Sequence, residues 1–241
     1  MLAISHAQLD LLRDSRESEC IARLEQSLRL SFPRDVARLS EQQLRSHVGL
    51  GIKRCRARGY HLECDIYLYI TMMFMLGSYF DEDPQLPWAG QLLSLGAPLA
   101  DLHSEALHYL DRVAGEENEH LIQALLNVRQ LELATLPNAD TADFEEQLLR
   151  LLHTTHPAKF EAQSKEASHA VVELGRSLAE RYSMPGGGAA LLAGFAFLMG
   201  TGFDRDLVHP WIGETLREPG GDAKVRLLHR RAVEFAEISL R

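Results

Sequence analysis

The sequence predicts an all-α protein built as a tandem duplication of one helical unit. Three observations support this fold class: helix start and stop signals recur along the chain, sustained alternation of apolar and polar residues is absent, and one twenty-residue segment occurs twice. We expect about ten helices, packed as a bundle in which the two copies are related by a pseudo-two-fold axis.

The first helices are indicated by capping boxes, in which a serine and a residue three positions later each bond the other's backbone amide. Ser5 with Gln8 and Ser40 with Gln43 have this spacing. The polar residues at 14–18 predict an interruption between two early helical segments.

The next two helices are predicted to end at glycines, which adopt a left-handed conformation without strain. Gly59 and Gly77 hold these positions, and Pro87 suits the first turn of the helix that follows, because that position needs no amide donor. The apolar spacing comes from Val48, Ile52, Cys55, Ile66, Ile70 and Met73.

The second half begins after a predicted break at residues 135–144, with Asp140 or Thr141 as the N-cap of the next helix. The glycines of PGGGAALL, residues 185–192, indicate a turn between closely packed helices, because no phosphate-binding GK[ST] sequence follows them. Amphipathic helices are expected in the ranges 145–182, 189–200 and 223–239.

The repeated segment is FMLGSYFDEDPQLPWAGQLL at 74–93 and FLMGTGFDRDLVHPWIGETL at 197–216. Aligned without a gap, nine of the twenty positions are identical, where composition alone would give about one or two. Upstream, the dipeptide FP at 32–33 aligns with HP at 156–157. We therefore predict a first helical repeat at 1–114, a connecting helix and loop at 115–139, and a second helical repeat at 140–241.

The composition predicts a cytoplasmic protein that binds neither nucleic acid nor membranes. The net charge is −9 and the pI about 5.7, which argues against general binding to polyanions. The three cysteines fit neither a disulfide framework nor a CxxC metal site, and no signal-peptide pattern opens the chain. The most apolar runs, 66–80 and 189–203, are shorter than the ~20 residues that span a bilayer. The basic run from Lys53 to Arg58 is expected to form a solvated helix face.

Each repeat carries the pattern FDxD, whose carboxylates could bind a hard cation or transfer protons. A structural role is favoured, in which the aspartates bond free amides of the turn and of the helix that follows. Calcium would need more oxygen ligands and usually a loop glycine, which the first loop lacks. The four aspartates are Asp81, Asp83, Asp204 and Asp206.

Two Glu-x-x-His pairs, Glu117 with His120 and Glu166 with His169, have the ligand spacing of di-iron helical bundles. With eleven histidines in the chain, about one such pair arises by chance, so neither a metal site nor a cofactor is predicted. No nucleophilic catalytic arrangement is recognisable, and we assign no catalytic residue. Met72, Met73, Met75 and Met199 could form an adaptable binding face but are predicted to pack in the core.

A set of short motifs extends over roughly residues 1–100. These motifs are Ile4-Ser5, Ala7-Gln8-Leu9, Phe32-Pro33, Gly51-Ile52, Gly59-Tyr60, Gly77, Phe80-Asp81, Asp83-Pro84 and Pro87-Trp88. They resemble small helical accessory proteins of bacterial type VI secretion effector modules, an effector co-chaperone and adaptor-associated family. The resemblance implies an interaction module without catalytic activity. The second repeat departs from the pattern, with Arg181 opposite Gly59 and Leu207 opposite Pro84.

The leading hypothesis is therefore a non-enzymatic adaptor or co-chaperone that binds a type VI secretion effector or its chaperone and assists loading. An immunity protein that neutralises a cognate toxin is one alternative, because an acidic surface would suit a basic nuclease. A metal-dependent helical-bundle enzyme is the other. The predicted partner is a protein, and the oligomeric state is left open. The residues predicted to bind the partner are Tyr79, Asp81, Asp83, Trp88, Asp204, Asp206 and Trp211.

Overall fold

The computed structural model describes residues 6–240, with side chains described from residue 17 onward. Within that range the chain forms thirteen α-helices, four short 3-10 helices and no strand, which confirms the all-α prediction. The helix count exceeds the predicted ten because helices such as α2 (Pro33–Val36) and α9 (Pro157–Glu161) are too short to leave a periodic pattern.

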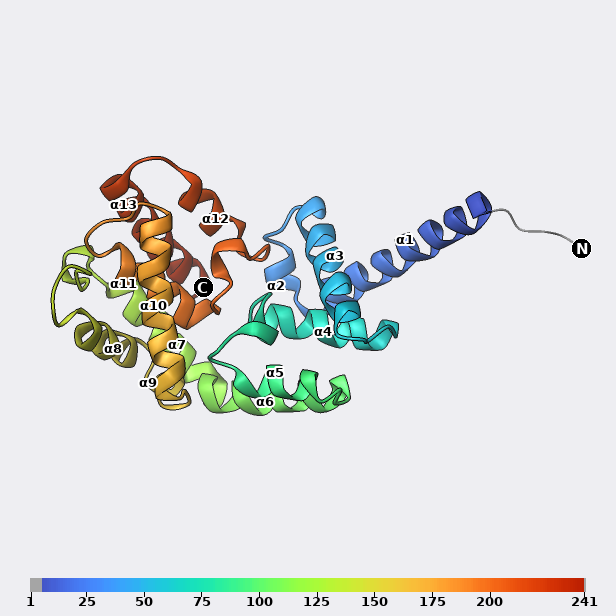
Figure 1. The fold of residues 1–241 in the computed structure, drawn as a ribbon, viewed down its shortest axis with the longest axis horizontal. Helices are drawn as coiled ribbons and strands as arrows, with labels where there is room; N and C mark the ends of the chain where they lie inside the picture. Colours follow the sequence, from blue (N-terminus) through green and yellow to red (C-terminus); the bar gives the residue numbers. More distant parts are fainter. Residues whose placement is uncertain (1–5, 241) are drawn as a thin grey trace, which may run out of the picture.

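The helices form two groups of six, separated along the chain by α7 (Glu119–Gln130). Figure 1 shows the first group on the right and the second on the left. The first group contains α1 (His6–Ser31), α2, α3 (Glu41–Ala57), α4 (Glu63–Leu76), α5 (Pro87–Ser94) and α6 (Leu99–Ala114). The second contains α8 (Phe144–Thr155), α9, α10 (Lys165–Arg181), α11 (Gly188–Met199), α12 (Pro210–Arg217) and α13 (Gly221–Ser239). The 3-10 helices are η1 (Phe80–Glu82), η2 (Glu116–Asn118), η3 (Leu133–Thr135) and η4 (Phe203–Arg205).

Each group has its own cluster of buried hydrophobic side chains, one within residues 24–113 and one within residues 136–228. The apolar helices α4 and α11 contribute many of these side chains, because most of their residues are buried. In the second group α10 and α11 lie very close together. A Cβ on Gly175 would lie 2.6 Å from the Ala189 carbonyl oxygen, so only glycine permits this approach.

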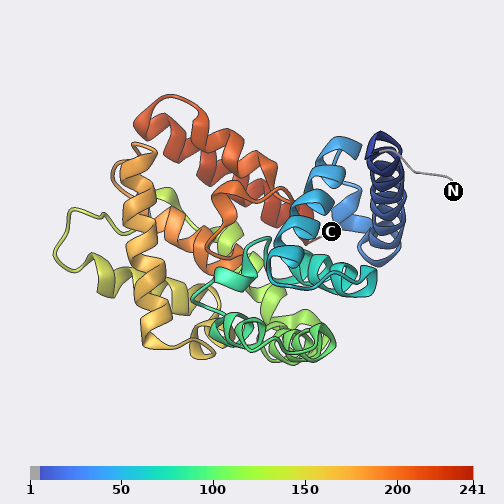
Figure 2. The same ribbon diagram turned by 45° about the vertical axis from the view of Figure 1, so that its right-hand side comes forward.

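Helix α7 connects the two groups and packs against α6, α8 and α13. The C-terminal helix α13 extends toward the first group (Figure 2). There the Arg38 guanidinium lies 5.6 Å from the centre of the Phe235 ring, so a residue that follows α2 contacts α13.

The local signals at helix ends are mostly confirmed. Ser40 and Gln43 form the predicted capping box. Helix α4 ends at Gly77, whose φ is +99°, and Gly59 follows α3 with a φ of +90°. Pro87 begins α5 as predicted. These features are confirmed because they depend only on neighbouring residues.

The range 145–182 is helical as predicted and is divided, at His156 and again before α10, into α8, α9 and α10. Two local predictions are wrong. Helix α1 continues through residues 14–18, because polar residues fit the solvent-facing side of a helix, and residues 17–19 are exposed. Helix α8 has Asp143 as its N-cap instead of Asp140 or Thr141. The predicted cap at Ser5 lies outside the described residues.

Candidate functional site

The two FDxD loops, residues 77–86 and 200–209, lie against each other between the two groups of helices. We call their contact the seam. Each loop begins at a glycine that ends an apolar helix, Gly77 after α4 and Gly200 after α11. Their φ angles, +99° and +90°, lie in the region that favours glycine.

The two glycines also allow the loops to approach closely. A Cβ on Gly77 would lie 2.7 Å from the Met199 carbonyl oxygen, which is closer than real atoms pack. A Cβ on Gly200 would lie 3.3 Å from the Leu76 carbonyl oxygen. Each glycine therefore faces the end of the other loop's preceding helix.

Two aspartates bond across the seam in a reciprocal way. The Asp83 carboxylate accepts a hydrogen bond from the Thr201 amide (2.9 Å). The Asp206 carboxylate accepts one from the Ser78 amide (2.9 Å) and one from Ser78 Oγ (2.5 Å). Both aspartates are buried. Since these bonds join the two groups of helices, they stabilise the contact between them.

Each of these aspartates also bonds an amide of its own turn. Asp83 accepts a hydrogen bond from the Gln85 amide (2.9 Å), and Asp206 accepts one from the Val208 amide (2.8 Å). The prediction that they bond free turn amides is therefore confirmed. The predicted bonds to amides of the helices that follow are wrong, since neither α5 nor α12 has a side-chain cap. The carboxylates bond the opposite loop instead.

Asp81 is held by arginines of the first group. Its side chain, 1 % exposed, pairs with Arg54 and with Arg58 (2.9 Å). Arg54 also pairs with Glu82 (2.9 Å). The Arg54 side chain is only 15 % exposed, so the prediction of a wholly solvated basic face is wrong at this residue. It is drawn inward because a buried carboxylate requires a cation beside it.

Asp204, the counterpart of Asp81, has weaker partners. The Tyr182 hydroxyl donates a hydrogen bond to it (3.0 Å), and the Arg181 guanidinium lies 3.7 Å away. Its side chain is 10 % exposed and Arg181 is largely in solvent. The same carboxylate position is therefore neutralised less completely in the second group.

Tyr79 lies at the edge of the seam. Its ring lies between two guanidinium groups, that of Arg54 at 4.7 Å and that of Arg205 at 3.9 Å from the ring centre. A Cβ on Gly202 would collide with the Tyr79 side chain. Gly202 is the position aligned with Tyr79, so only one of the two can carry a large side chain.

The tryptophans lie on the first turns of α5 and α12. The Trp88 ring lies 6.0 Å from that of Tyr109. The Trp211 ring contacts two aromatic rings, Phe195 at 5.8 Å and Phe235 at 6.0 Å. Both tryptophans are half-buried, so each packs against its own group and keeps part of its ring accessible.

The seven residues predicted to bind a partner thus occupy three kinds of place. Three lie at the seam, two are the arginine-paired aspartates beside it, and two are the tryptophans. Their role in partner binding stays a prediction. The buried members are Asp81, Asp83 and Asp206, and those that keep exposed surface are Tyr79, Trp88, Asp204 and Trp211.

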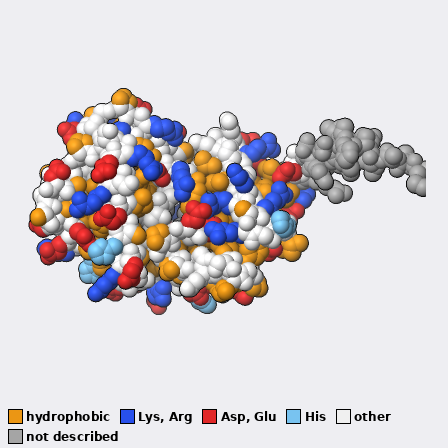
Figure 3. Space-filling view, in the orientation of Figure 1, with side chains coloured by type: hydrophobic (Ala, Val, Ile, Leu, Met, Phe, Trp, Pro, Cys, Tyr) orange, Lys and Arg blue, Asp and Glu red, His pale blue; other side chains and the backbone are white. Residues whose placement is uncertain are grey.

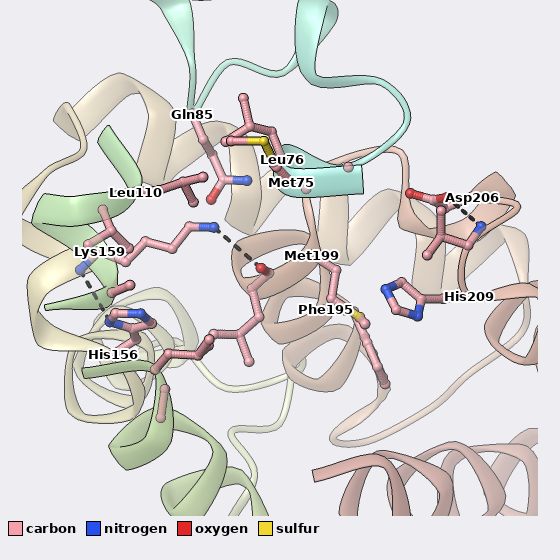
Figure 4. A pocket seen from close by; sticks show the side chains of 18 of the residues that line it. Met75, Leu76, Gln85, Leu110, His156, Lys159, Phe195, Met199, Asp206 and His209 are labelled. Carbon is pink, nitrogen blue, oxygen red and sulfur yellow. Dashed lines mark hydrogen bonds between the residues drawn. The ribbon is translucent and has the colours of Figure 1, made fainter. Parts of the chain in front are cut away.

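A cavity of about 290 Å³ lies beside the seam, lined by both groups of helices and by α7 (Figure 4). Leu121 on α7 lines it and is 44 % exposed, so the cavity reaches the surface there. Most of the wall is apolar, and its side chains include Met75, Leu76, Leu110, Leu125, Phe195 and Met199.

The methionines divide between the core and this cavity. Met72 and Met73 are fully buried, which confirms their predicted core packing. Met75 and Met199 are only partly buried and line the cavity. The second pair therefore provides flexible apolar side chains where space remains.

Polar side chains lie at one end of the cavity: Lys159 and His156 of the second group and Gln85 of the first (Figure 4). Lys159 Nζ donates to the Leu198 carbonyl oxygen (3.4 Å), and the His156 ring accepts a hydrogen bond from the Lys159 amide (3.3 Å). Burial lowers the pKa of Lys159 to about 8. Burial, together with the Lys159 charge, lowers the pKa of His156 to about 4.

Asp206 and His209 line the opposite end of the cavity.

His47 on α3 is fully buried, with its ring 4.5 Å from that of Phe74. Neither ring nitrogen of His47 has a hydrogen-bond partner among the described residues. Burial lowers the pKa values of His47 and His209, so both imidazoles are neutral near pH 7.

The two Glu-x-x-His pairs do not converge on a metal site. His120 lies 3.7 Å from Glu119, and His169 lies 2.8 Å from Glu145 on α8. Among the described residues, no group of three His, Cys, Asp or Glu side chains is placed to hold a metal ion.

No sequence motif marked Lys159, whereas His156 belongs to the dipeptide that aligns with residues 32–33. The signal that could have located them is the alignment of residues 32–33 with 156–157, because a proline begins both α2 and α9. The place of Lys159 in the cavity depends on how α9 packs against α6, which no local pattern specifies.

Helices within residues 6–240 are too short or too polar to cross a membrane. Comparison of the chain with protein-family models, curated proteins and solved structures returned no match.

Proposed function

We propose that the protein is a non-enzymatic adaptor or co-chaperone that binds a type VI secretion effector or its chaperone and assists loading. The observation that supports this most directly is that all four FDxD aspartates take part in structural bonds. A carboxylate that holds a catalytic cation or moves a proton must be able to reach its substrate. These carboxylates instead hold loops and arginines, which favours a binding role. The resemblance of the first repeat supplies the class of partner.

We also propose that the two groups of helices are copies of one unit related by a pseudo-two-fold axis, with the connector at 115–139. The same element order in both groups supports this. Each has an apolar helix ending at glycine, a 3-10 turn, a short Pro-Trp helix and a longer amphipathic helix. The reciprocal bonds also support it, because a two-fold axis relates the Asp83–Thr201 contact to the Asp206–Ser78 contact.

The partner surface we propose is the outer edge of the seam, around Tyr79. Two neighbouring side chains of opposite charge, Glu82 and Arg205, are 51 % and 59 % exposed. In the orientation of Figure 1, the space-filling view shows acidic and basic side chains close together near the middle of the molecule (Figure 3). Tyrosine and arginine often contribute most of the energy of protein interfaces, and this edge carries both.

Co-expression tests this function. The chain is produced with the products of the neighbouring effector and chaperone genes, each separately, and co-elution is measured. We expect co-elution with one of them, and a Tyr79→Ala/Arg205→Glu variant should weaken binding by at least about tenfold. The matched control is Arg150→Glu on α8, whose side chain is 67 % exposed. Unfolding temperatures of both variants separate lost binding from lost folding.

The outcomes distinguish the alternatives. Binding to the toxin alone, with restored growth of toxin-producing cells, would replace the adaptor assignment with an immunity protein. Stoichiometric iron, manganese or calcium in the purified chain would favour the metal-dependent enzyme. Co-elution with neither gene product would contradict the proposal.

A further inference from the structure

We propose that the cavity beside the seam binds a small carboxylic acid with an apolar tail, and that Lys159 binds the carboxylate. The ammonium group lies at one end of a cavity whose wall is otherwise mostly apolar (Figure 4). The cavity is distinct from the proposed partner surface at Tyr79, so the two proposals stand or fall separately.

The Lys159 ammonium lies over the Phe197 ring, 5.7 Å from the ring centre, but has no anionic partner among the described residues. An ammonium has three N–H donors, and its one hydrogen bond, to the Leu198 carbonyl oxygen, is long at 3.4 Å. No carboxylate of the described residues lies within 4.0 Å of it. Asp83 is the nearest acid to influence it, but the Asp83 carboxylate already accepts hydrogen bonds from Gln85 and Thr201. An anionic ligand would supply the missing partner.

Electrostatics favours the same ligand. Burial lowers the pKa of Lys159 to about 8, while the charge of Asp83 opposes this shift, so a further anion beside the ammonium would favour its charged form. The titratable groups that face it are Asp83 across the seam and His156 beside it, and His156 is neutral at pH 7. A ligand carboxylate would stabilise the charged ammonium and raise its pKa.

The volume and the apolar wall of the cavity determine which ligand tail fits. At about 290 Å³, the cavity has room for about ten water-sized groups, which suits an acid of medium chain length. One cation matches a carboxylate, whereas a phosphate would call for several donors. The apolar wall includes the flexible side chains of Met75 and Met199, which can adapt to a tail.

Calorimetric titration tests the site. We expect decanoate to bind at pH 7 at least about tenfold more tightly than 1-decanol, which has the same tail without the charge. Lys159→Met should remove this preference, and Lys159→Arg should keep part of it. The control is Lys165→Met, because Lys165 is exposed at the start of α10. Equal affinity for acid and alcohol, or an unchanged preference in Lys159→Met, would overturn the proposal.

A second measurement uses the unaltered chain, which has only four lysines. Acetylation with acetic anhydride at pH 8 is followed residue by residue by mass spectrometry. Decanoate should slow the modification of Lys159 by about tenfold or more while leaving Lys165 unchanged. Failure of decanoate to protect Lys159 would contradict the assignment even if the Lys159→Met variant does not fold.

Discussion

The two loops of the seam have similar backbone conformations but differ in the side chains that surround them. Their glycines have φ angles of +99° and +90°, and the turn hydrogen bonds that Asp83 and Asp206 accept from backbone amides measure 2.9 and 2.8 Å. Yet Asp81 is held by two arginines, and Asp204 by a tyrosine and a distant arginine. A contact between the loops must fit both loops, so those contacts are alike. A contact between a loop and its own group of helices has no such requirement and can differ.

The two loops differ most clearly at the aligned positions Tyr79 and Gly202. They face each other at the edge of the seam, where a Cβ on Gly202 would collide with the tyrosine ring. Two positions in direct contact compete for one space, so the two loops differ there. The following predictions test this comparison, from the largest expected effect to the smallest.

Replacement of Asp81 and of Asp204 should lower the free energy of unfolding by different amounts. Asp81→Ala is expected to cost about 3 kcal/mol, because it removes the buried carboxylate that pairs with Arg54 and Arg58 and leaves Arg54 only the exposed Glu82. Asp204→Ala should cost about 1 kcal/mol, because it mainly loses the Tyr182 bond. Urea unfolding followed by circular dichroism measures both. Equal costs would show that the two loops are held alike.

Acid should destabilise the protein through His156, whose counterpart in the first group is Phe32. The unfolded imidazole has a pKa of 6.5 and the folded one about 4, so the unfolded state binds more protons between these values. The free energy of unfolding is therefore unaffected by His156 above pH 6.5. As the pH falls from 6.5 to 4, protonation of the unfolded imidazole lowers it by about 3 kcal/mol. His156→Phe should reduce this loss. An unchanged pH profile of the unfolding free energy would contradict the assignment.

The tryptophans should differ by their aromatic neighbours. Trp211→Ala is expected to cost about 3 kcal/mol, because its ring packs against both Phe195 and Phe235. Trp88→Ala should cost about 2 kcal/mol, since it contacts only Tyr109 among the aromatic rings. Thermal unfolding gives both values. A stable Trp88→Ala that no longer binds its partner would identify Trp88 as a contact residue instead.

Adding one methyl group at the edge of the seam should have the smallest effect. Gly202→Ala is expected to cost about 1–2 kcal/mol, because the new Cβ meets the Tyr79 side chain. Gly194→Ala on α11 is the control, since no atom lies within 4 Å of its added Cβ, and it should be neutral or stabilising. Adding Tyr79→Ala to Gly202→Ala should recover part of the cost. Without such recovery, the two positions do not compete.

The sequence could predict what neighbouring residues determine. The helix ends at Gly59 and Gly77, the capping box at Ser40 and the turn bonds of Asp83 follow from spacing alone. The bond from Thr201 to Asp83 could not be predicted, because its partners are 118 residues apart. The helix through residues 14–18 was missed for a different reason: a polar segment suits a loop and an exposed helix face equally well.

The cavity lay beyond sequence reasoning. Its wall combines α4, α6, α7, α9, α11 and α13, so it exists only once both groups of helices are packed. Lys159 gave no local signal because lysines are common at protein surfaces, and one lysine on a five-residue helix does not stand out. The aligned prolines at residues 33 and 157 were the one sequence feature that indicated a helix at the position of α9.

The connector has a consequence for how the protein behaves on dilution. Because residues 115–139 join both sides of the seam in one chain, each side meets the other at an effective concentration on the order of millimolar, however little protein is present. The carboxylate–amide bonds of the seam can then stay formed even when the protein is very dilute. Cleavage at the exposed Asp140, directly after these residues, would remove that advantage and make the seam depend on concentration.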